Sequence, residues 1–327
     1  MNIWHTLKKP IFILAPMEDV TDTVFRQIIM ACGRPSLFFT EFTNVDGMAS
    51  AGDEEVSKRL RFTQKEGPII AQVWGMKPEN YFSAAGRIAE MGYDGIDINM
   101  GCPQKAVVSR GACSALIKNP SLAKEIIQAT REGAKGLPVS VKTRIGFKTN
   151  VLDTWIGFLL EQQLDALAIH ARTASEMSKV PAHWEVMPAA VTIRNQIAPK
   201  TILIGNGDVK SLEDARSKAK QYGLDGIMIG RGVFENPWIF NSSVQIEHVG
   251  PQERLELLVK HVTLYEKTWG QKKNFQILKK YFKIYVSNFP GAQDLRMKLI
   301  ETENGKEVMS IMDKTMPLVS KPDILTA

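Results

Sequence analysis

Eight short apolar runs recur at intervals of about 25–45 residues through the first 230 residues, and this repetition constrains the fold most strongly. Most of the runs are nearly continuous in apolar residues rather than alternating, which is typical of strands that are covered on both faces. The predicted strands are Ile11–Ala15, Leu37–Glu41, Ile69–Val73, Gly95–Asn99, Val139–Thr143, Ala166–His170, Ile202–Asn206 and Gly226–Gly230. Each interval leaves room for one crossover helix, so the runs predict repeated strand–helix units.

Helix signals lie between these runs. Asn119 and Pro120 offer an N-cap and a first-turn proline for one helix. Ser211 with Asp214 resembles a capping box, and Gly223 can end the helix that follows it. The sequence therefore predicts strands and helices in regular alternation.

The pattern changes beyond about Asn241, where helical periodicity replaces the β-type runs. We therefore predict an α/β fold, a (β/α)8 TIM barrel over residues 1–240, followed by an all-helical domain over residues 241–327. The last dozen residues, with Pro317 and Pro322, are expected to form a loose tail. A doubly wound open sheet is the alternative, but eight regular units favour a closed barrel.

The charge of the chain is concentrated in one window of the helical part. The chain has 41 Lys and Arg against 35 Asp and Glu, and residues 272–298 carry the whole excess. We read this window as a helix from about Gln271 to Phe289, with its lysines within about 120° of arc. A lysine stripe is usually only a solvated face, but this one is uncompensated and predicts contact with a nucleic-acid backbone. The expected contacts are Lys279, Lys280, Lys283 and Arg296.

Composition argues against several other classes of protein. Apolar residues make up 44% and charged residues 23%, which are ordinary globular values. The sequence contains no run of about 18 apolar residues that could span a membrane, and its first ten residues lack the apolar core of a signal peptide. Cys32, Cys102 and Cys113 form no Cys-x-x-Cys pair, which argues against a disulfide scaffold or a zinc site. We expect a cytoplasmic monomer without a metal or a membrane partner.

Polar residues gather at the predicted strand ends, where the active site of a barrel forms. A buried strand has little reason to end in Lys, His or Asn unless a site needs them. In chain order these residues are Pro16, Met17, Glu18, Glu41, Asn44, Gln72, Asn99, Cys102, Lys142, Arg144, His170, Arg172, Asn206, Gly207, Asp208, Gly230 and Arg231.

The last two strand ends predict a phosphate site. The turns at residues 205–208 and 230–232 are rich in glycine, so their backbone N–H groups can approach a phosphate, and Arg231 can add a charge-assisted contact. The glycines of either turn alone could instead serve only to allow positive φ angles. Because the two turns follow the last two strands of the predicted barrel, we favour a phosphate-binding site.

A flavin and a reactive thiol fit the remaining groups. Lys142 could stabilise negative charge on a reduced flavin, and Gln72 could hydrogen-bond the polar edge of the same ring. A lysine that only extends from a strand end is the alternative. Cys102 lies in a Gly-Cys-Pro turn that holds its thiol over the barrel mouth. Cys32 and Cys113 are expected to be packed small residues, with a second thiol near the site as the alternative for Cys113.

Together these motifs resemble the dihydrouridine synthase family, in its bacterial form, over essentially the whole chain. The matching segments are Ala15-Pro16-Met17, Ala71-Gln72, Asn99-x-Gly-Cys102-Pro103, Lys142-Thr-Arg144, His170-Ala-Arg172-Thr173, Asn206-Gly207-Asp208, Gly230-Arg231-Gly232 and Asn288-Phe289-Pro290-Gly291-Ala292. One departure is Ser109-Arg110-Gly111-Ala112, where many relatives have Lys-Gly-Gly after the cysteine turn.

The resemblance implies an FMN-dependent enzyme that uses NADPH to reduce the C5–C6 bond of uridine in tRNA. It implies that Cys102 protonates C5, that His170 lies at the flavin, and that Asn99, Lys142, Arg144 and Arg172 hold FMN or the flipped uridine. Two alternatives remain open from the sequence. One is an FMN barrel that acts on a small enone or dihydropyrimidine, and the other is a catalytically silent RNA-binding relative.

Overall fold

All eight predicted strands are present in the structure, a computed structural model that describes residues 2–319. They are β1 (Ile11–Leu14), β2 (Phe38–Phe39), β4 (Ile69–Trp74), β5 (Gly95–Met100), β6 (Val139–Arg144), β7 (Ala166–His170), β8 (Ile202–Asn206) and β9 (Gly226–Ile229). The sequence analysis missed one two-residue strand, β3 (Thr43–Asn44), which pairs in parallel with β4.

The strands form one parallel sheet that closes on itself. Their order is β1-β9-β8-β7-β6-β5-β4-β2, and a parallel bridge between Ile13 and Leu37 joins the two ends. The backbone N–H of Ser36 also donates to the carbonyl of Phe12 at 2.7 Å. Closure confirms the predicted barrel and excludes the doubly wound open sheet.

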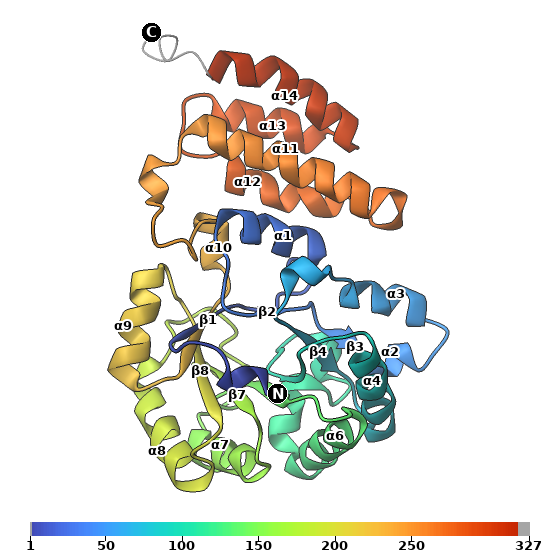
Figure 1. Cartoon of the computed structure of the whole chain (residues 1–327), viewed down its shortest axis with the longest axis vertical. Helices are drawn as coiled ribbons and strands as arrows, with labels where there is room; N and C mark the ends of the chain where they lie inside the picture. The colour runs from blue at the N-terminus through green and yellow to red at the C-terminus, as the bar shows by residue number, and fades with distance from the viewer. Residues whose placement is uncertain (1, 320–327) are drawn as a thin grey trace. The chain divides into compact units, whose positions relative to one another are not determined.

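Helices between the strands surround the barrel, as Figure 1 shows for α4, α6, α7, α8 and α9. The expected caps are present: the side chain of Asn119 accepts the N–H of Leu122, and that of Ser211 accepts the N–H of Asp214. Gly223 ends α9 in the left-handed conformation, at φ 67°. The helices between β1 and β9 that belong to the barrel are α2 (Val45–Met48), α3 (Asp53–Ser57), α4 (Pro78–Glu90), α5 (Lys105–Val108), α6 (Pro120–Gly133), α7 (Leu152–Glu161), α8 (Met187–Ile197) and α9 (Leu212–Tyr222).

Apolar side chains fill the amino-terminal end of the barrel. Trp4, which is 1% exposed, belongs to the same core cluster as Ile11, Ala166 and Ile202, the first residues of β1, β7 and β8. Burial of a large apolar side chain such as Ile11 or Ile202 is worth roughly 1.5–3 kcal/mol. Because this end is packed with apolar groups, the polar residues of the interior lie toward the carboxyl ends of the strands.

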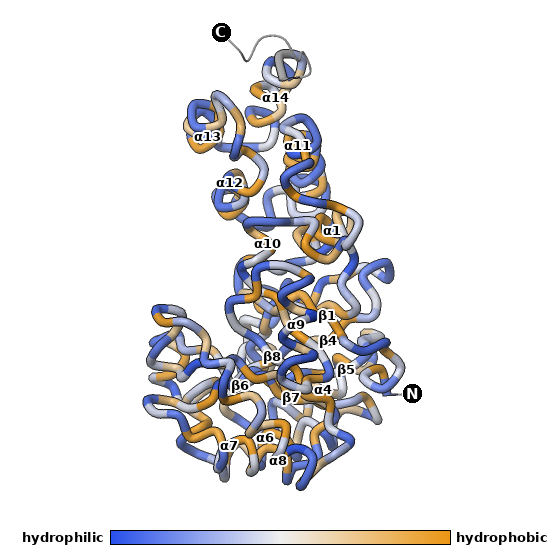
Figure 2. The backbone as a smooth tube through the Cα atoms, turned by 90° about the vertical axis from the view of Figure 1, so that its left-hand side faces the viewer, coloured by the Kyte–Doolittle hydropathy of each residue, from blue (hydrophilic) through white to orange (hydrophobic). Residues whose placement is uncertain are grey.

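Contacts between residues divide the chain into two compact units. One contains residues 1–23 and 35–231, and the other contains residues 24–34 and 232–327. The second unit is helical, with most of α1 (Thr23–Cys32) and with α10 (Gly232–Glu235), α11 (Pro251–Thr268), α12 (Phe282–Tyr285), α13 (Ala292–Glu301) and α14 (Gly305–Val319). Along these helices orange and blue residues alternate in Figure 2, which fits helices with one apolar and one polar face.

Aromatic packing explains why α1 belongs to the second unit. The ring of Phe25 stacks on Tyr281 with centroids 4.9 Å apart, and it also lies 6.0 Å from the ring of His261. The Asn241 side chain donates to the carbonyl of Cys32 at 3.2 Å. Among residues 2–319, no helix is both long enough and apolar enough to cross a membrane.

The prediction of one continuous basic helix over residues 271–289 is wrong. This segment forms short 3-10 turns at Gly270–Lys272 and Phe275–Tyr281, followed by the one-turn helix α12. The Asn274 side chain caps the second of these turns, and Asn288 takes a left-handed conformation at φ 63°. These local caps interrupt the 3.6-residue period on which the lysine stripe depended.

The prediction of a loose tail is wrong for its first residues, which are helical. Helix α14 continues through Pro317 to Val319, and the burial of Val308 and Met312 on its apolar face supports it. The rest of the predicted tail, including Pro322, lies outside the described residues.

Candidate active site at the carboxyl ends of the strands

The strand register brings several predicted site residues side by side. Asn99 on β5 is the direct partner of Lys142 on β6. Two residues further along β6, Arg144 is the partner of His170 on β7, and His170 is the partner of Asn206 on β8. The Lys142 ammonium donates to the Asn206 side-chain oxygen at 3.2 Å. The polar residues predicted from separate strand ends therefore form one cluster.

Lys142 is a cation in a poorly hydrated position. Burial, with a further contribution from the nearby Arg144, lowers the pKa of Lys142 to about 8. The group is still mainly charged at pH 7, but an anion beside it would be favoured because little water screens the interaction. Such a cation suits a ligand that gains negative charge during a reaction.

His170 is a neutral imidazole in this cluster. Burial lowers its pKa well below the usual range, and the charges of Arg144, Lys142 and Arg172 act in the same direction. A ring nitrogen of His170 lies 3.1 Å from the Arg172 guanidinium. His170 can therefore offer a hydrogen bond to a bound ring without adding another charge.

Cys102 is the half-buried thiol of the site. A hydrogen bond from the Cys113 thiol lowers the pKa of Cys102 to about 7, with a further contribution from the charge of Arg144, although burial opposes the change. A group with this pKa exchanges a proton readily near neutral pH, which is what a general acid requires.

Cys113 combines the two roles that the sequence offered for it, a packed small residue and a second thiol near the site. It is fully buried, as expected for a packed residue, but it also hydrogen-bonds Cys102. Its backbone has a left-handed conformation at φ 52°, and the N–H of Ser114 donates to the Cys102 carbonyl at 3.3 Å. Ten residues, four of which form α5, separate Cys102 from Cys113, so the folded segment is what brings the two thiols together.

Two predicted substrate-binding arginines have their donors occupied by the protein. Arg144, 7% exposed, donates to the carbonyls of Gly101, Thr173 and Met177 at 2.7–2.9 Å. Arg172, 2% exposed, donates to the Val180 carbonyl and forms an ion pair with Asp208. Both arginines therefore tie together the loops around the barrel mouth, and Arg144 places its charge near Cys102.

The two glycine-rich turns have the features of an anion site. The backbone N–H groups of Gly207, Asp208, Gly230 and Arg231 donate to no other group within residues 2–319. Strands β8 and β9 are neighbours, so these N–H groups belong to adjacent strand ends. Gly207 has φ 135°, and a Cβ there would lie 2.7 Å from the Cβ of Ala182, so only glycine fits.

Of the two charged residues in these turns, Asp208 is held by protein partners, whereas Arg231 is accessible to a ligand. The Asp208 carboxylate accepts from the Ala182 N–H at 3.0 Å, and it pairs with Arg172 and, at 2.9 Å, with Arg231. These partners hold the pKa of Asp208 below its usual range despite its partial burial. Arg231 is 60% exposed, so it remains accessible to an anion.

The first strand end contributes Pro16, Met17 and Glu18. The Met17 N–H donates to the hydroxyl of Thr21 at 2.9 Å. The Glu18 carboxylate accepts from Arg59 at 2.7 Å. The sequence analysis did not single out Arg59, and this pairing directs the Glu18 carboxylate to a protein partner.

The predicted nucleic-acid contacts all lie in the second unit. Lys280 and Lys283 are exposed, whereas Lys279 and Arg296 are half-buried. Arg296 donates to the Val286 carbonyl at 2.6 Å, so it also holds the end of α12 in place. In residues 2–319, no group of three or more His, Cys, Asp or Glu side chains is arranged to hold a metal ion.

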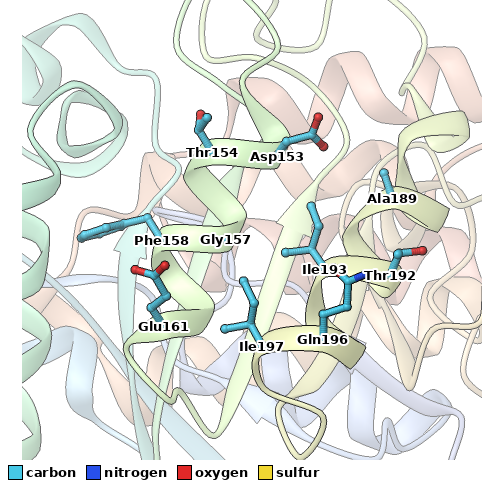
Figure 3. Close-up of a pocket in the computed structure, with 10 residues that line it drawn as sticks. All are labelled: Asp153, Thr154, Gly157, Phe158, Glu161, Ala189, Thr192, Ile193, Gln196 and Ile197. Atoms are coloured by element: carbon cyan, nitrogen blue, oxygen red, sulfur yellow. The ribbon is translucent and has the colours of Figure 1, made fainter.

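A separate hollow of about 770 Å³ lies between α7 and α8 on the outside of the barrel. Figure 3 shows Ile193 and Ile197 of α8 facing the helix that carries Gly157 and Phe158. None of the predicted site residues lines this hollow, so it is distinct from the candidate active site.

Comparison with known proteins gives one family model and relatives that match nearly the whole chain. The family model described as dihydrouridine synthase (Dus) matches residues 13–318. A "Probable tRNA-dihydrouridine synthase 2" of Bacillus subtilis (strain 168) is 45% identical over 316 residues, which cover 95% of this chain and 96% of that protein. A "Probable tRNA-dihydrouridine synthase" of Staphylococcus aureus (strain Mu50) is 44% identical over 316 residues, 96% of this chain and 95% of that protein. Among solved structures, morphinone reductase in complex with tetrahydroNAD matches with a TM-score of 0.49 and 15% identity, over 72% of this chain and 86% of that one.

Proposed function

Because the chain belongs to the dihydrouridine synthase family, we propose that it reduces the C5–C6 bond of specific uridines in tRNA to 5,6-dihydrouridine, with FMN as cofactor and NADPH as reductant. The observation that carries this proposal is the half-buried Cys102 thiol, which shares one barrel mouth with the cation Lys142 and the anion-binding turns of β8 and β9.

The donor set at this mouth fits FMN. The free N–H groups of the two glycine-rich turns and the exposed Arg231 would hold the phosphate. Lys142 and Gln72 would contact the isoalloxazine ring, with Lys142 favouring its negatively charged reduced form, and His170 would contact it as a neutral group. When bound, FMN would supply hydride chemistry, here directed to C6 of the uracil.

Cys102 would act as the general acid that protonates C5. Its pKa of about 7 means that roughly half of the thiol is protonated at neutral pH. A uridine in folded RNA is stacked, so it has to be extruded before its ring can reach a thiol in a barrel mouth. Asn99, Arg144 and Arg172 would shape the pocket for the extruded base, the two arginines chiefly by holding the surrounding loops.

The second unit would bind the tRNA backbone. Lys279, Lys280, Lys283 and Arg296 belong to the window that carries the net positive charge of the chain. Phosphate contacts need charge and access rather than a regular helix, so the irregular structure of this segment is compatible with the role.

The proposal is tested on the purified protein and on a Cys102→Ala variant. We expect denatured wild-type protein to release FMN, and NADPH to reduce the bound flavin before added tRNA reoxidises it with formation of dihydrouridine. Cys102→Ala should retain flavin and its reduction by NADPH, but it should form dihydrouridine about 10²–10⁴ times more slowly.

Cys32→Ala is the matched control, because Cys32 is 4% exposed and belongs to the other unit. It should remain active. Release of FAD, or of no flavin, would contradict the cofactor assignment. Unimpaired dihydrouridine formation by Cys102→Ala would contradict the role of the thiol.

A further inference from the structure

A chain of buried hydrogen bonds links the neighbouring strands β4 and β5 and ends at the turn that carries Cys102. The Gln72 amide nitrogen donates to one oxygen of Asp97 at 2.8 Å. The Asn99 amide nitrogen donates to the Gln72 oxygen at 3.2 Å. The Asn99 oxygen accepts the N–H groups of Gly101 and Cys102, each at 3.0 Å. We call the side chains of Asp97, Gln72 and Asn99 the amide relay.

The direction of the relay is fixed at both ends. Backbone N–H groups can only donate, so Asn99 must turn its oxygen toward the Cys102 turn and its nitrogen toward Gln72. Gln72 must then turn its oxygen toward Asn99 and its nitrogen toward Asp97. All three side chains are at most 6% exposed, so water does not substitute for a missing partner. A reversed amide would place two donors or two acceptors face to face.

We propose that Asp97 is a positioning residue, which acts as a hydrogen-bond acceptor that fixes the orientation of the Gln72 amide and, through Asn99, the backbone turn that holds Cys102. In the proposed function Gln72 contacts the flavin and Cys102 protonates the substrate, so one carboxylate orders both groups. The inference rests on the proposed function for the roles of these two groups, but not for the hydrogen bonds themselves.

The acceptor oxygen of Asp97, rather than its charge, is what the relay requires. The second Asp97 oxygen accepts from the Ser140 hydroxyl at 2.6 Å, and Ser140 is its direct partner on β6. A hydroxyl can also accept, so in Asp97→Asn the new amide can keep its oxygen toward Gln72 and donate to Ser140. In Asp97→Leu, which keeps the branched shape of the side chain but replaces both oxygens with methyl groups, Gln72 has no acceptor and its amide is no longer held in one orientation.

Thiol titration measures the state of the turn without any cofactor or tRNA. The pH dependence of alkylation by iodoacetamide is followed at Cys102 by mass spectrometry. Cys32 and Cys113 are buried and burial raises the pKa of each, so they interfere little. We expect wild type, Asp97→Asn and the control Ser140→Ala to titrate near pH 7. In Asp97→Leu, Cys102 should titrate at least one pH unit higher, because the turn no longer holds its thiol in the hydrogen bond with Cys113.

A second measurement follows uridine reduction. Asp97→Leu should lower kcat about 10- to 100-fold without a matching change in the KM for tRNA, and Asp97→Asn should restore most of the activity. If Asp97→Leu does not fold, Gln72→Met breaks the same relay one link later and should shift the Cys102 titration in the same direction.

The outcomes separate this inference from the proposed function. A wild-type protein without flavin or uridine reduction would overturn the proposed function, whereas the titration would still test the relay. An unshifted Cys102 titration in the folded Asp97→Leu or Gln72→Met protein would overturn the relay. An equal shift in Asp97→Asn and Asp97→Leu would also overturn it, because charge rather than acceptor geometry would then be responsible.

Discussion

Cys113 should set the pH range over which Cys102 can act as an acid, and replacing it with Ala tests this directly. The hydrogen bond from Cys113 is the largest influence that lowers the pKa of Cys102 from 9.0 to about 7. Cys113→Ala removes this donor, so the pKa of Cys102 should rise. A general acid works only in its protonated form, so the variant should remain active to higher pH than wild type.

The size of the effect follows from the two pKa values. With a pKa of about 7, roughly nine-tenths of Cys102 is protonated at pH 6 and about one-tenth at pH 8. If the pKa returns fully to 9.0, about nine-tenths is protonated at pH 8 as well. The variant should therefore match wild type at pH 6 and exceed it by up to about tenfold at pH 8.

The assay is the single-turnover reoxidation of reduced flavin by tRNA, measured between pH 6 and pH 9 under anaerobic conditions. Cys32→Ala is the control and should reproduce the wild-type profile, because Cys32 lies in the other unit. A wild-type rate that stays level to pH 9, or the same midpoint in Cys113→Ala and wild type, would refute the reasoning.

Two further predictions concern the second unit and the stability of the barrel. Changing Lys280 and Lys283 together to Gln should lower the slope of log tRNA affinity against log salt concentration by about two. The control Lys220→Gln on α9 should leave this slope unchanged. Equal slopes in wild type and both variants would show that Lys280 and Lys283 contact solvent and not tRNA. Asp225→Asn should lower the free energy of unfolding in urea by about 2 kcal/mol, because Asp225 accepts from Arg194 and two further donors. These donors hold the pKa of Asp225 below its usual range despite burial, so this stabilisation is present at neutral pH and should disappear as the pH falls through that lowered pKa.

The fold was predictable because its signals are local. Each strand of a barrel is a short apolar run, and caps such as Asn119 and Ser211 act within three residues of themselves. The carboxyl ends of parallel strands converge, so the order of the strands alone brought Asn99, Lys142 and His170 into one cluster.

The features that the sequence did not reveal depend on contacts between distant residues or on a broken period. Cys113 reaches Cys102 only through the conformation of its loop, and the pairing of Arg59 with Glu18 spans 41 residues. The prediction of a helix over the basic segment was wrong because Asn274 caps a 3-10 turn and Asn288 takes a left-handed conformation. A helical wheel considers only the spacing of residues and does not include such local conformations. Asp97 did leave a signal, since a carboxylate in the middle of an apolar strand, two residues before Asn99, points to the same face.

The membership of α1 in the second unit has a consequence for how the gene can be divided. The chain passes between the units three times, after residues 23, 34 and 231, so the second unit is not a continuous C-terminal fragment. A fragment that begins at Gly232 lacks Phe25, and with it the ring that stacks on Tyr281. Exchange of the second unit between relatives would therefore have to transfer two separate stretches of coding sequence together. A single crossover near the end of the barrel would leave mismatched aromatic partners in both products.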